Sequence, residues 1–347
     1  PIVGVRDFVT TESHIPVRVF YPSSAKKEGT VGWFVRSYAY FIDGYFHTLL
    51  PWLREYAVVQ WIIMTISFVL SWMLPMGNAY LPNCAYDASP LVNAGRKYPL
   101  IVFSHGLTGT GEEHALMFSY WAQKGYVIAS VHHCDGSSSK VPRRGEKHLL
   151  YEHPDFINYD KDFRPRQVER REAELYEGLQ FVLKDSLFSA DVRSVIDDTS
   201  VIVGGFSYGA ATATLSVTKR PNTYTACLLL DGWFYIDLGE GFKFPEPAHA
   251  KGLDIPALFI GSEQFANWEG IAKATAELAM SNTHSAGSIT HVLQGSRHQN
   301  FTDVGFWLPT GVLSKVRMTG ECDYDEKYHE LLNMTLTFFD SRTNSTD

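Results

Sequence analysis

Residues 200–209 read SVIVGGFSYG and contain the pattern Gly-x-Ser-x-Gly, with Ser207 at its centre. An apolar run rich in valine and isoleucine precedes this pattern, and the segment AATATLSVTK follows it, so the serine lies between a predicted strand and a predicted helix. In that setting the two glycines let strand and helix approach closely, and the serine hydroxyl is presented on a tight turn. The stretch therefore predicts a nucleophilic serine rather than a structural serine in a glycine-rich turn.

Short apolar runs alternate with helical patterns along the rest of the chain. Strands are predicted at 15–22, 99–104, 126–131, 226–231, 255–263 and 289–294, and an amphipathic helix at 166–184. This alternation is typical of a mostly parallel sheet flanked by helices. With the turn around Ser207 it predicts an α/β-hydrolase fold, in one domain that spans 1–347.

A second glycine-rich turn, Ser104-His105-Gly106-Leu107, follows the predicted strand 99–104. In α/β hydrolases a turn at this place supplies one backbone N–H group of the oxyanion hole, and the residue after the nucleophile supplies the other. These donors are therefore assigned to Leu107 and Tyr208. An ordinary glycine turn is the alternative.

The remaining members of a serine triad follow the nucleophile in the order acid, then histidine. His298 lies late in the chain, in GSRHQNF after the predicted strand 289–294, and is the expected base. His284 and His291 lie nearby, and His329 falls in a predicted C-terminal helix. Chain order and the local turn favour His298.

The acid is left open by the residues themselves. Asp231 ends the strand after the nucleophile, and Glu263 ends the next one. A carboxylate at either place would orient an imidazole equally well. Asp237 and Asp254 are weaker candidates, expected in solvated loops.

Composition argues against several other classes of protein. The net charge is −8, which gives no basic patch for nucleic acid and no general attraction to anionic membranes.

The histidine pair at 132 and 133 has no carboxylate or cysteine at ligand spacing, so it is expected to be structural. No metal or organic cofactor is predicted. The four cysteines are far apart and lack a Cys-x-x-Cys pair: Cys84, Cys134, Cys227 and Cys322.

Residues 56–76, YAVVQWIIMTISFVLSWMLPM, carry no charge. Their length permits a transmembrane helix, but they separate two predicted strands that could not pair in one sheet across a bilayer. The segment is interpreted as an apolar helix lying in a membrane interface, with a buried core helix and a true span as alternatives. Its polar residues, Gln60, Ser67 and Ser71, share one face of a helix. The residues expected to contact lipid are Trp61, Ile62, Phe68, Val69 and Trp72.

Farther on, the polar stretch 135–165 is predicted to be a surface flap.

These segments resemble the platelet-activating factor acetylhydrolases of the plasma and intracellular type II group. KYPLIVFSHGL at 97–107, GGFSYGAAT at 204–212, LLDGWFY at 229–235 and GSRHQNFTD at 295–303 fall in the family's order. The resemblance implies Ser207 as nucleophile, His298 as base and the segment around Asp231 as the source of the acid. It also implies a hydrophobic helix that contacts a membrane or lipoprotein. Phe206, where the family usually has histidine, and Arg297, where it has an apolar residue, are departures.

The resemblance implies serine-dependent, calcium-independent hydrolysis of the sn-2 acyl ester of phospholipids, with acetyl or short chains as substrates. The alternatives are a carboxylesterase or lysophospholipase with the same triad, and a catalytically silent membrane-binding module. A phospholipid and a lipid surface are the expected partners, in a peripheral membrane location. The compartment, the oligomeric state and what precedes Pro1 are left open.

Overall fold

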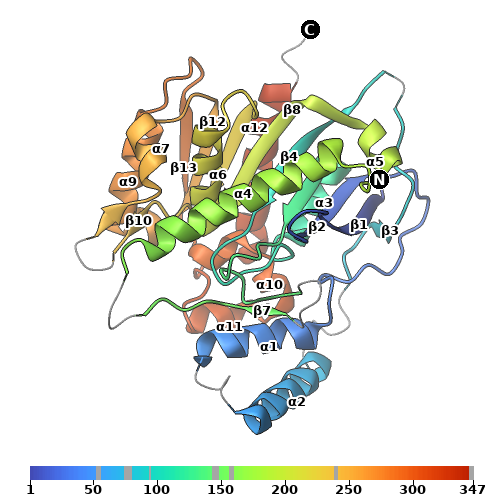
Figure 1. The fold of residues 1–347 in the computed structure, drawn as a ribbon, viewed down its shortest axis with the longest axis vertical. Helices are drawn as coiled ribbons and strands as arrows, with labels where there is room; N and C mark the ends of the chain where they lie inside the picture. Colours follow the sequence, from blue (N-terminus) through green and yellow to red (C-terminus); the bar gives the residue numbers. More distant parts are fainter. Residues whose placement is uncertain are drawn as a thin grey trace.

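The computed structural model describes residues 1–51, 56–73, 80–93, 95–142, 148–155, 160–237 and 241–343. Its centre is a nine-stranded sheet with the order β13-β12-β9-β8-β4-β5-β2-β1-β3 (Figure 1). Neighbours run parallel from β13 to β5, whereas β2 pairs antiparallel with both β5 and β1. The sheet strands are β1 (Val3–Val9), β2 (Pro16–Pro22), β3 (Cys84–Tyr86), β4 (Tyr98–Ser104), β5 (Val127–Val131), β8 (Ile196–Phe206), β9 (Ala226–Leu230), β12 (Ala257–Ser262) and β13 (Ser288–Leu293).

Helices cover both faces of this sheet, and each face has its own apolar core. Along β4 the side chains alternate between the two cores, with Leu100 and Val102 in one and Ile101 and Phe103 in the other. The first core is closed by α4 (Phe163–Lys184), α6 (Tyr208–Lys219), α7 (Glu246–Lys251) and α9 (Glu269–Met280), and the second by α3 (Ala115–Gln123), α10 (Val304–Trp307) and α12 (Tyr324–Thr343). A strand buried on both faces reads as a continuous apolar run, which is why PLIVFS was recognisable in the sequence.

The predicted α/β-hydrolase architecture is confirmed: a mostly parallel sheet with helices on both sides. Shorter elements complete the described chain. They are α5 (Ala190–Ser194), α8 (Glu263–Ala266), the 3₁₀ turn η3 (His298–Phe301), α11 (Thr310–Lys315), and the small hairpins β6 (Lys140–Val141) with β7 (Leu149–Leu150) and β10 (Tyr235–Ile236) with β11 (Phe242–Lys243).

Two helices, α1 (Tyr38–Leu49) and α2 (Ala57–Met73), lie together at one end of the molecule, away from the sheet (Figure 1). The helix predicted at 56–76 is therefore present from Ala57 to Met73, and 74–76 lies outside the described residues. Strands β2 and β4, on either side of it in sequence, belong to one sheet, as the argument against a span requires. Within the described part of the chain, no helix combines the length and apolarity needed to cross a membrane.

Part of the stretch 135–165, which its polar composition predicted to be a surface flap, is buried. Ser137, Ser138 and Ser139 are at most 2% exposed, and α4 already begins at Phe163. Ser137 and Ser138 bond to the turns after β4 and β5: the carbonyl of Ser137 accepts the N–H of Thr108, which follows β4, and the hydroxyl of Ser138 donates to the carbonyl of His133, which follows β5. Residues 143–147 and 156–159 of the predicted flap lie outside the described residues.

Candidate active site

Ser207 occupies the tight turn between β8 and α6, with a φ of 57° in the left-handed region. Two close approaches explain the glycines on either side. A Cβ atom at Gly205 would lie 2.1 Å from the carbonyl oxygen of Gly209, and one at Gly209 would lie 1.9 Å from the carbonyl oxygen of Ser104. The strained serine backbone is held by its N–H, which donates to the carbonyl of Leu230 at 2.9 Å.

Three side chains from different strand ends form one hydrogen-bonded chain. His298 Nε2 lies 3.0 Å from Ser207 Oγ, and His298 Nδ1 lies 2.6 Å from Asp231 Oδ2. Asp231 is buried and also accepts the backbone N–H of Ser262 at 2.6 Å and its hydroxyl at 2.9 Å. The carboxylate is thereby fixed from behind, and the imidazole is oriented toward the serine.

Aromatic rings hold the imidazole of His298 on both sides. The Phe206 ring lies 4.5 Å from it with an interplanar angle of 27°, and the Phe265 ring lies 4.4 Å away at 13°. The backbone N–H of His298 donates to the side-chain oxygen of Gln264 at 3.0 Å. Phe206, a departure from the resembling family, thus packs directly against the imidazole of His298. None of these contacts was foreseen from the sequence.

The loop after His298 is anchored to distant parts of the chain through Asp303. This buried carboxylate accepts the indole N–H of Trp33 at 2.7 Å, the backbone N–H of Leu116 at 2.8 Å and the hydroxyl of Tyr328 at 2.5 Å. Burial raises the pKa of Asp303 to about 7, against the effect of these donors.

The other acids weighed in the sequence lie elsewhere. Glu263 begins α8, and its carboxylate accepts the N–H of Gly295 at 2.6 Å instead of a histidine. Asp254 accepts the hydroxyl of Thr283 at 3.1 Å. Asp237 is exposed beyond β10.

The rival histidines are also apart from Ser207. His284 closes a turn by accepting the N–H of Ala286 at 3.0 Å. His291 and His329 are exposed, on the edge strand β13 and on α12 respectively.

The two backbone groups assigned to the oxyanion hole lie beside Ser207. Tyr208 is the first residue of α6, where an N–H group has no carbonyl of its own helix to donate to. Leu107 follows Gly106, whose Cβ position would be 3.4 Å from Ser207 Cβ. Leu107, Ser207 and His298 line the same cavity. If Ser207 attacks a carbonyl carbon, the N–H groups of Leu107 and Tyr208 are therefore close enough to donate hydrogen bonds to the carbonyl oxygen.

That cavity has a volume of about 510 Å³ and is mainly apolar and aromatic. Helix α1 contributes Phe41, Ile42 and Tyr45 to its wall. One buried carboxyl group, Glu113, also lines it and accepts the hydroxyl of Tyr45. Burial raises the pKa of Glu113 to about 8. The sequence did not indicate Glu113, because no spacing of residues around it is typical of a buried carboxyl group.

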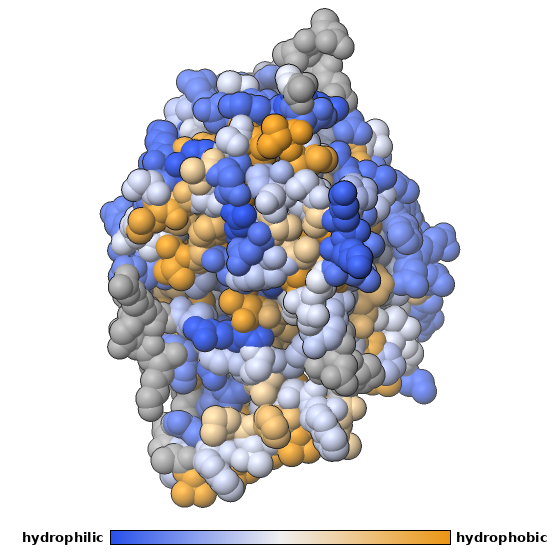
Figure 2. Space-filling view, turned by 90° about the vertical axis from the view of Figure 1, so that its right-hand side faces the viewer, coloured by the Kyte–Doolittle hydropathy of each residue, from blue (hydrophilic) through white to orange (hydrophobic). Residues whose placement is uncertain are grey.

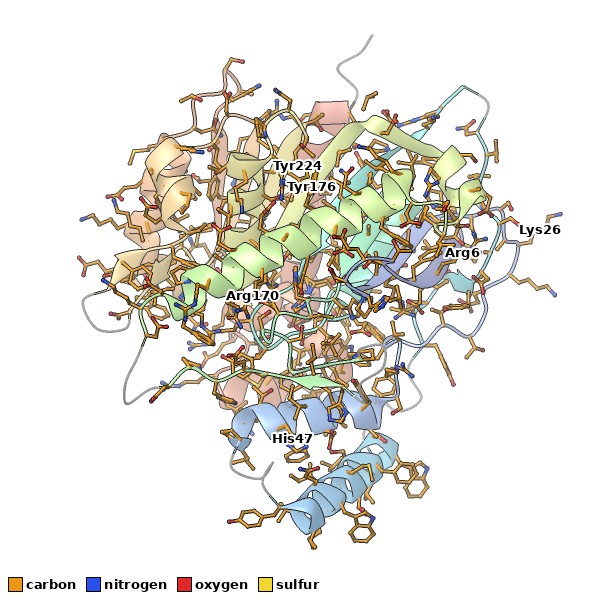
Figure 3. The ribbon with its side chains drawn as sticks, viewed as in Figure 1. Arg6, Lys26, His47, Arg170, Tyr176 and Tyr224 are labelled. Carbon is orange, nitrogen blue, oxygen red and sulfur yellow. The ribbon has the colours of Figure 1, made fainter. Side chains whose placement is uncertain are left out.

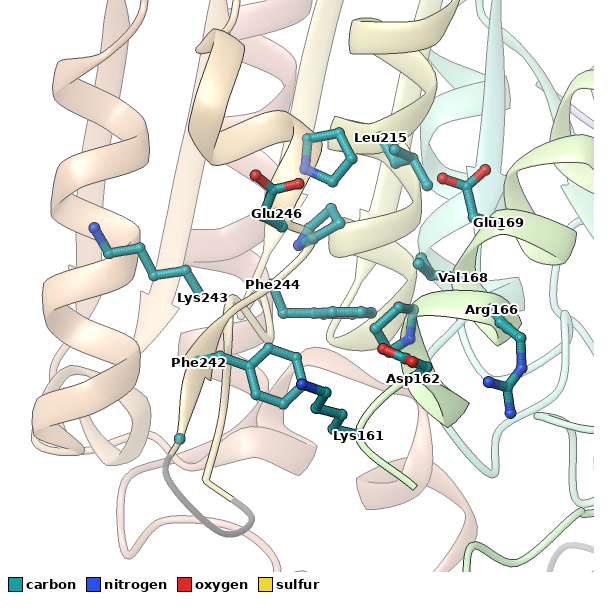
Figure 4. A pocket seen from close by; sticks show the side chains of 14 residues that line it. Lys161, Asp162, Arg166, Val168, Glu169, Leu215, Phe242, Lys243, Phe244 and Glu246 are labelled. Atoms are coloured by element: carbon teal, nitrogen blue, oxygen red, sulfur yellow. The ribbon is translucent and has the colours of Figure 1, made fainter. Parts of the chain in front are cut away.

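A larger cavity, of about 1060 Å³, lies along α4, α6 and β11 and is lined by none of Ser207, Asp231 and His298 (Figure 4). Three of its charged side chains are paired with neighbours: Arg166 with Asp160, Lys243 with Glu277 and Glu169 with Lys219. The smaller cavity at Ser207 is therefore the candidate active site.

His132 and His133 each face a carboxylate that the sequence spacing did not reveal. His132 Nδ1 lies 3.6 Å from Glu112, and His133 Nδ1 lies 2.9 Å from Glu174. Across the described residues, no group of three potential ligands could hold a metal ion.

Helix α2 turns its apolar side chains outward. Trp61, Ile62, Phe68, Val69 and Trp72 are between 43% and 80% exposed, whereas Ser67 and Ile63 are buried. Ring-bearing side chains project from α2 away from the body of the protein (Figure 3), and hydrophobic residues lie among paler ones at that end of the surface (Figure 2). The polar stripe thus faces inward at Ser67, and α2 is not a buried core helix.

Residues 3–345 match the family described as platelet-activating factor acetylhydrolase, isoform II. The chain belongs to this family. The resemblance inferred from the sequence is confirmed, and the family is one of ester hydrolases.

Individual relatives are distant and longer. The platelet-activating factor acetylhydrolase of Gallus gallus is 25% identical over 74% of this chain and 64% of its own length. Those of Canis lupus familiaris and Bos taurus are 25% and 26% identical over 88% of this chain and 67% of their own. The chain therefore spans about two thirds of the length of these curated relatives.

A solved structure shares the fold. The ferulic acid esterase from Streptomyces cinnamoneus superposes with a TM-score of 0.67 at 17% identity, over 98% of this chain and 89% of that one. At this identity the similarity concerns the fold alone, and it agrees with the α/β-hydrolase architecture described above.

Proposed function

We propose that this protein hydrolyses the sn-2 acyl ester of phospholipids, with Ser207 as a calcium-independent nucleophile. The observation that carries the proposal is the hydrogen-bonded chain from Ser207 through His298 to Asp231, at the wall of an apolar cavity. Family membership supports a phospholipid as the substrate.

In the proposed mechanism, His298 Nε2 takes the proton of Ser207 as the hydroxyl oxygen attacks the ester carbonyl carbon. The oxygen of the tetrahedral intermediate accepts hydrogen bonds from the N–H groups of Leu107 and Tyr208. Asp231 stabilises the imidazolium, which then gives its proton to the departing alcohol. Water, activated by the same imidazole, attacks the acyl-enzyme and releases the carboxylate.

Intact-mass labelling with a fluorophosphonate tests the nucleophile. One adduct is expected on the wild type and none on Ser207→Ala. The wild type should keep its activity in EDTA; activity lost in EDTA and restored by calcium would contradict the proposal. A panel of short-chain and long-chain sn-2 phospholipids, lysophospholipids and simple esters then distinguishes this function from that of a general carboxylesterase or lysophospholipase.

We also propose that α2 lies in a lipid interface, through Trp61, Ile62, Phe68, Val69 and Trp72. An exposed apolar face of this kind is unfavourable in water and typical of a contact surface. Its partner helix α1 lines the candidate active site, so α2 would place the cavity close to the lipid.

Vesicle co-sedimentation tests this role. The triple variant Trp61→Ser, Phe68→Ser, Trp72→Ser should lose vesicle binding while keeping its activity on a soluble ester. The matched control replaces Val92, Leu187 and Met280, which are exposed by 70% or more on other parts of the surface, with serine. Equal binding by both folded variants would refute the interfacial role.

A further inference from the structure

Arg171 is a buried cation that the proposed mechanism does not use. It lies on α4 and is 0% exposed. Its guanidinium donates to the carbonyl of His105 and to the hydroxyls of Ser104 (3.2 Å), Ser137 and Thr212 (3.2 Å). Burial lowers the pKa of Arg171, and the charge of Asp135 opposes that effect. A charge buried this completely is unfavourable unless its donors are well satisfied, so the hydrogen bonds hold the surrounding backbone in place.

The contacts of Arg171 reach both halves of the proposed oxyanion hole. On one side it bonds the carbonyl of His105, two residues before Leu107. On the other, its Cζ lies 5.0 Å from the centre of the Tyr208 ring, and its Nε donates to Thr212, one turn farther along α6. One rigid planar group therefore connects the turn after β4 with the start of α6.

The turn itself passes this constraint on to the Leu107 N–H. The backbone N–H of His133 donates to His105 Nε2 at 3.2 Å, so the ring proton of neutral His105 is on Nδ1. Nδ1 lies 2.8 Å from the carbonyl oxygen of Gly106 and can donate to it. Burial, together with the charge of Arg171, keeps the pKa of His105 well below its usual range, which favours the neutral ring. Because a trans peptide is planar, fixing the Gly106 carbonyl also fixes the direction of the Leu107 N–H.

We propose that Arg171 is a positioning residue that aligns the two N–H donors, Leu107 and Tyr208, for the oxyanion. It touches neither the substrate cavity nor Ser207, and it acts through the His105 backbone and the start of α6. The inference rests on the proposed function, because an oxyanion hole has meaning only if Ser207 attacks an ester.

The test uses Arg171→Lys, which keeps the charge but lacks the planar fork needed to bond several groups at once. Removing one oxyanion donor outright lowers kcat by about 10²–10³-fold, so a misaligned pair should lower it by roughly 10–100-fold. KM should change by less than about threefold, because ground-state binding does not use these donors. The inhibition constant of a trifluoromethyl ketone, which places an oxyanion on the enzyme, should rise by the same factor as kcat falls.

Controls separate this role from a general structural one. Arg193→Lys is the matched variant, since Arg193 also donates to several backbone carbonyls, those of Phe181, Val182 and Asp185, and does not line the cavity at Ser207. It should leave kcat and the inhibition constant unchanged. If Arg171→Lys does not fold, Ser137→Ala and Thr212→Val each remove one of its hydrogen bonds, and each should show a smaller loss with the same signature.

Folded variants with wild-type kcat would overturn the proposal, as would a loss of kcat without a change in ketone affinity. A wild type that neither hydrolyses esters nor reacts with a fluorophosphonate would instead refute the proposed function itself.

Discussion

Asp231→Asn keeps the size of the side chain but replaces one of its two acceptor oxygens with an NH₂ group, which donates hydrogen bonds. Asp231 Oδ1 faces the backbone N–H of Ser262 at 2.6 Å, and this donor cannot become an acceptor. The amide oxygen of asparagine must therefore stay at that position, and the amide NH₂ group must face His298 Nδ1, where Oδ2 now lies at 2.6 Å. The imidazole then carries its proton on Nε2, toward Ser207, and cannot act as a base.

The expected loss is large because the required tautomer is lost while the packing is kept. In serine triads the equivalent change lowers kcat by about 10⁴-fold, which corresponds to roughly 5.5 kcal/mol in the activation free energy. KM should change little, since Asp231 is buried and does not line the cavity at Ser207. The Tm should stay close to that of the wild type, because the bond to the Ser262 N–H is kept.

The measurement is kcat on a soluble short-chain ester, together with the rate of fluorophosphonate labelling. Glu263→Gln is the matched control, because Glu263 was the rival acid in the sequence and its carboxylate bonds only the Gly295 N–H among the contacts described for it. That variant should keep kcat within about threefold of the wild type. An Asp231→Asn enzyme of nearly wild-type kcat, or an equal loss in Glu263→Gln, would refute the assignment of the acid.

Two further substitutions test the geometry and the buried charge. Gly209→Ala should abolish labelling of Ser207 and lower the Tm, because its Cβ would lie 1.9 Å from the Ser104 carbonyl oxygen; Gly311→Ala, with open space at its Cβ, should do neither. Glu113→Gln should change the pH dependence of stability. The folded-state pKa of Glu113 is about 8 against an ordinary value near 4.5, so its stabilising contribution is complete below about pH 4.5 and is lost as the pH rises through 8. Denaturant titrations from about pH 5 to 8 should show the wild type losing up to about 1.4 kcal/mol per pH unit relative to the variant, and a constant difference would contradict the raised pKa.

The sequence predicted the elements of the fold well because buried parallel strands have continuous apolar runs. The strands expected at 99–104 and 126–131 appear as Tyr98–Ser104 and Val127–Val131, and the strand expected just before Ser207 appears as Ile196–Phe206. The turn at Ser207 could be predicted equally well, since close backbone approach requires glycine at fixed positions around it.

What the sequence could not decide depends on contacts between distant strand ends. Asp231 and Glu263 each end a strand, and only the three-dimensional arrangement shows that the first faces His298 while the second bonds a backbone N–H. Arg171 and Glu113 escaped notice for the same reason. An arginine in the charged pattern of α4 looks solvated, and its burial follows from the position of α6 against α4. Part of the predicted flap at 135–165 is buried, at Ser137, Ser138 and Ser139, because polar residues can also be buried as hydrogen-bonding partners of a turn.

Helix α1 connects the two parts of the proposed function. One part of its surface packs against α2, and another supplies Phe41, Ile42 and Tyr45 to the cavity at Ser207. Its position is fixed by Asp43, a buried carboxylate that pairs with Lys140 of β6. A displacement of α2 by lipid would therefore be resisted at α1 by an ion pair to the hairpin of β6 and β7. This arrangement favours a fixed cavity held near the lipid over one that opens only when α2 binds, because moving α1 would separate two buried charges.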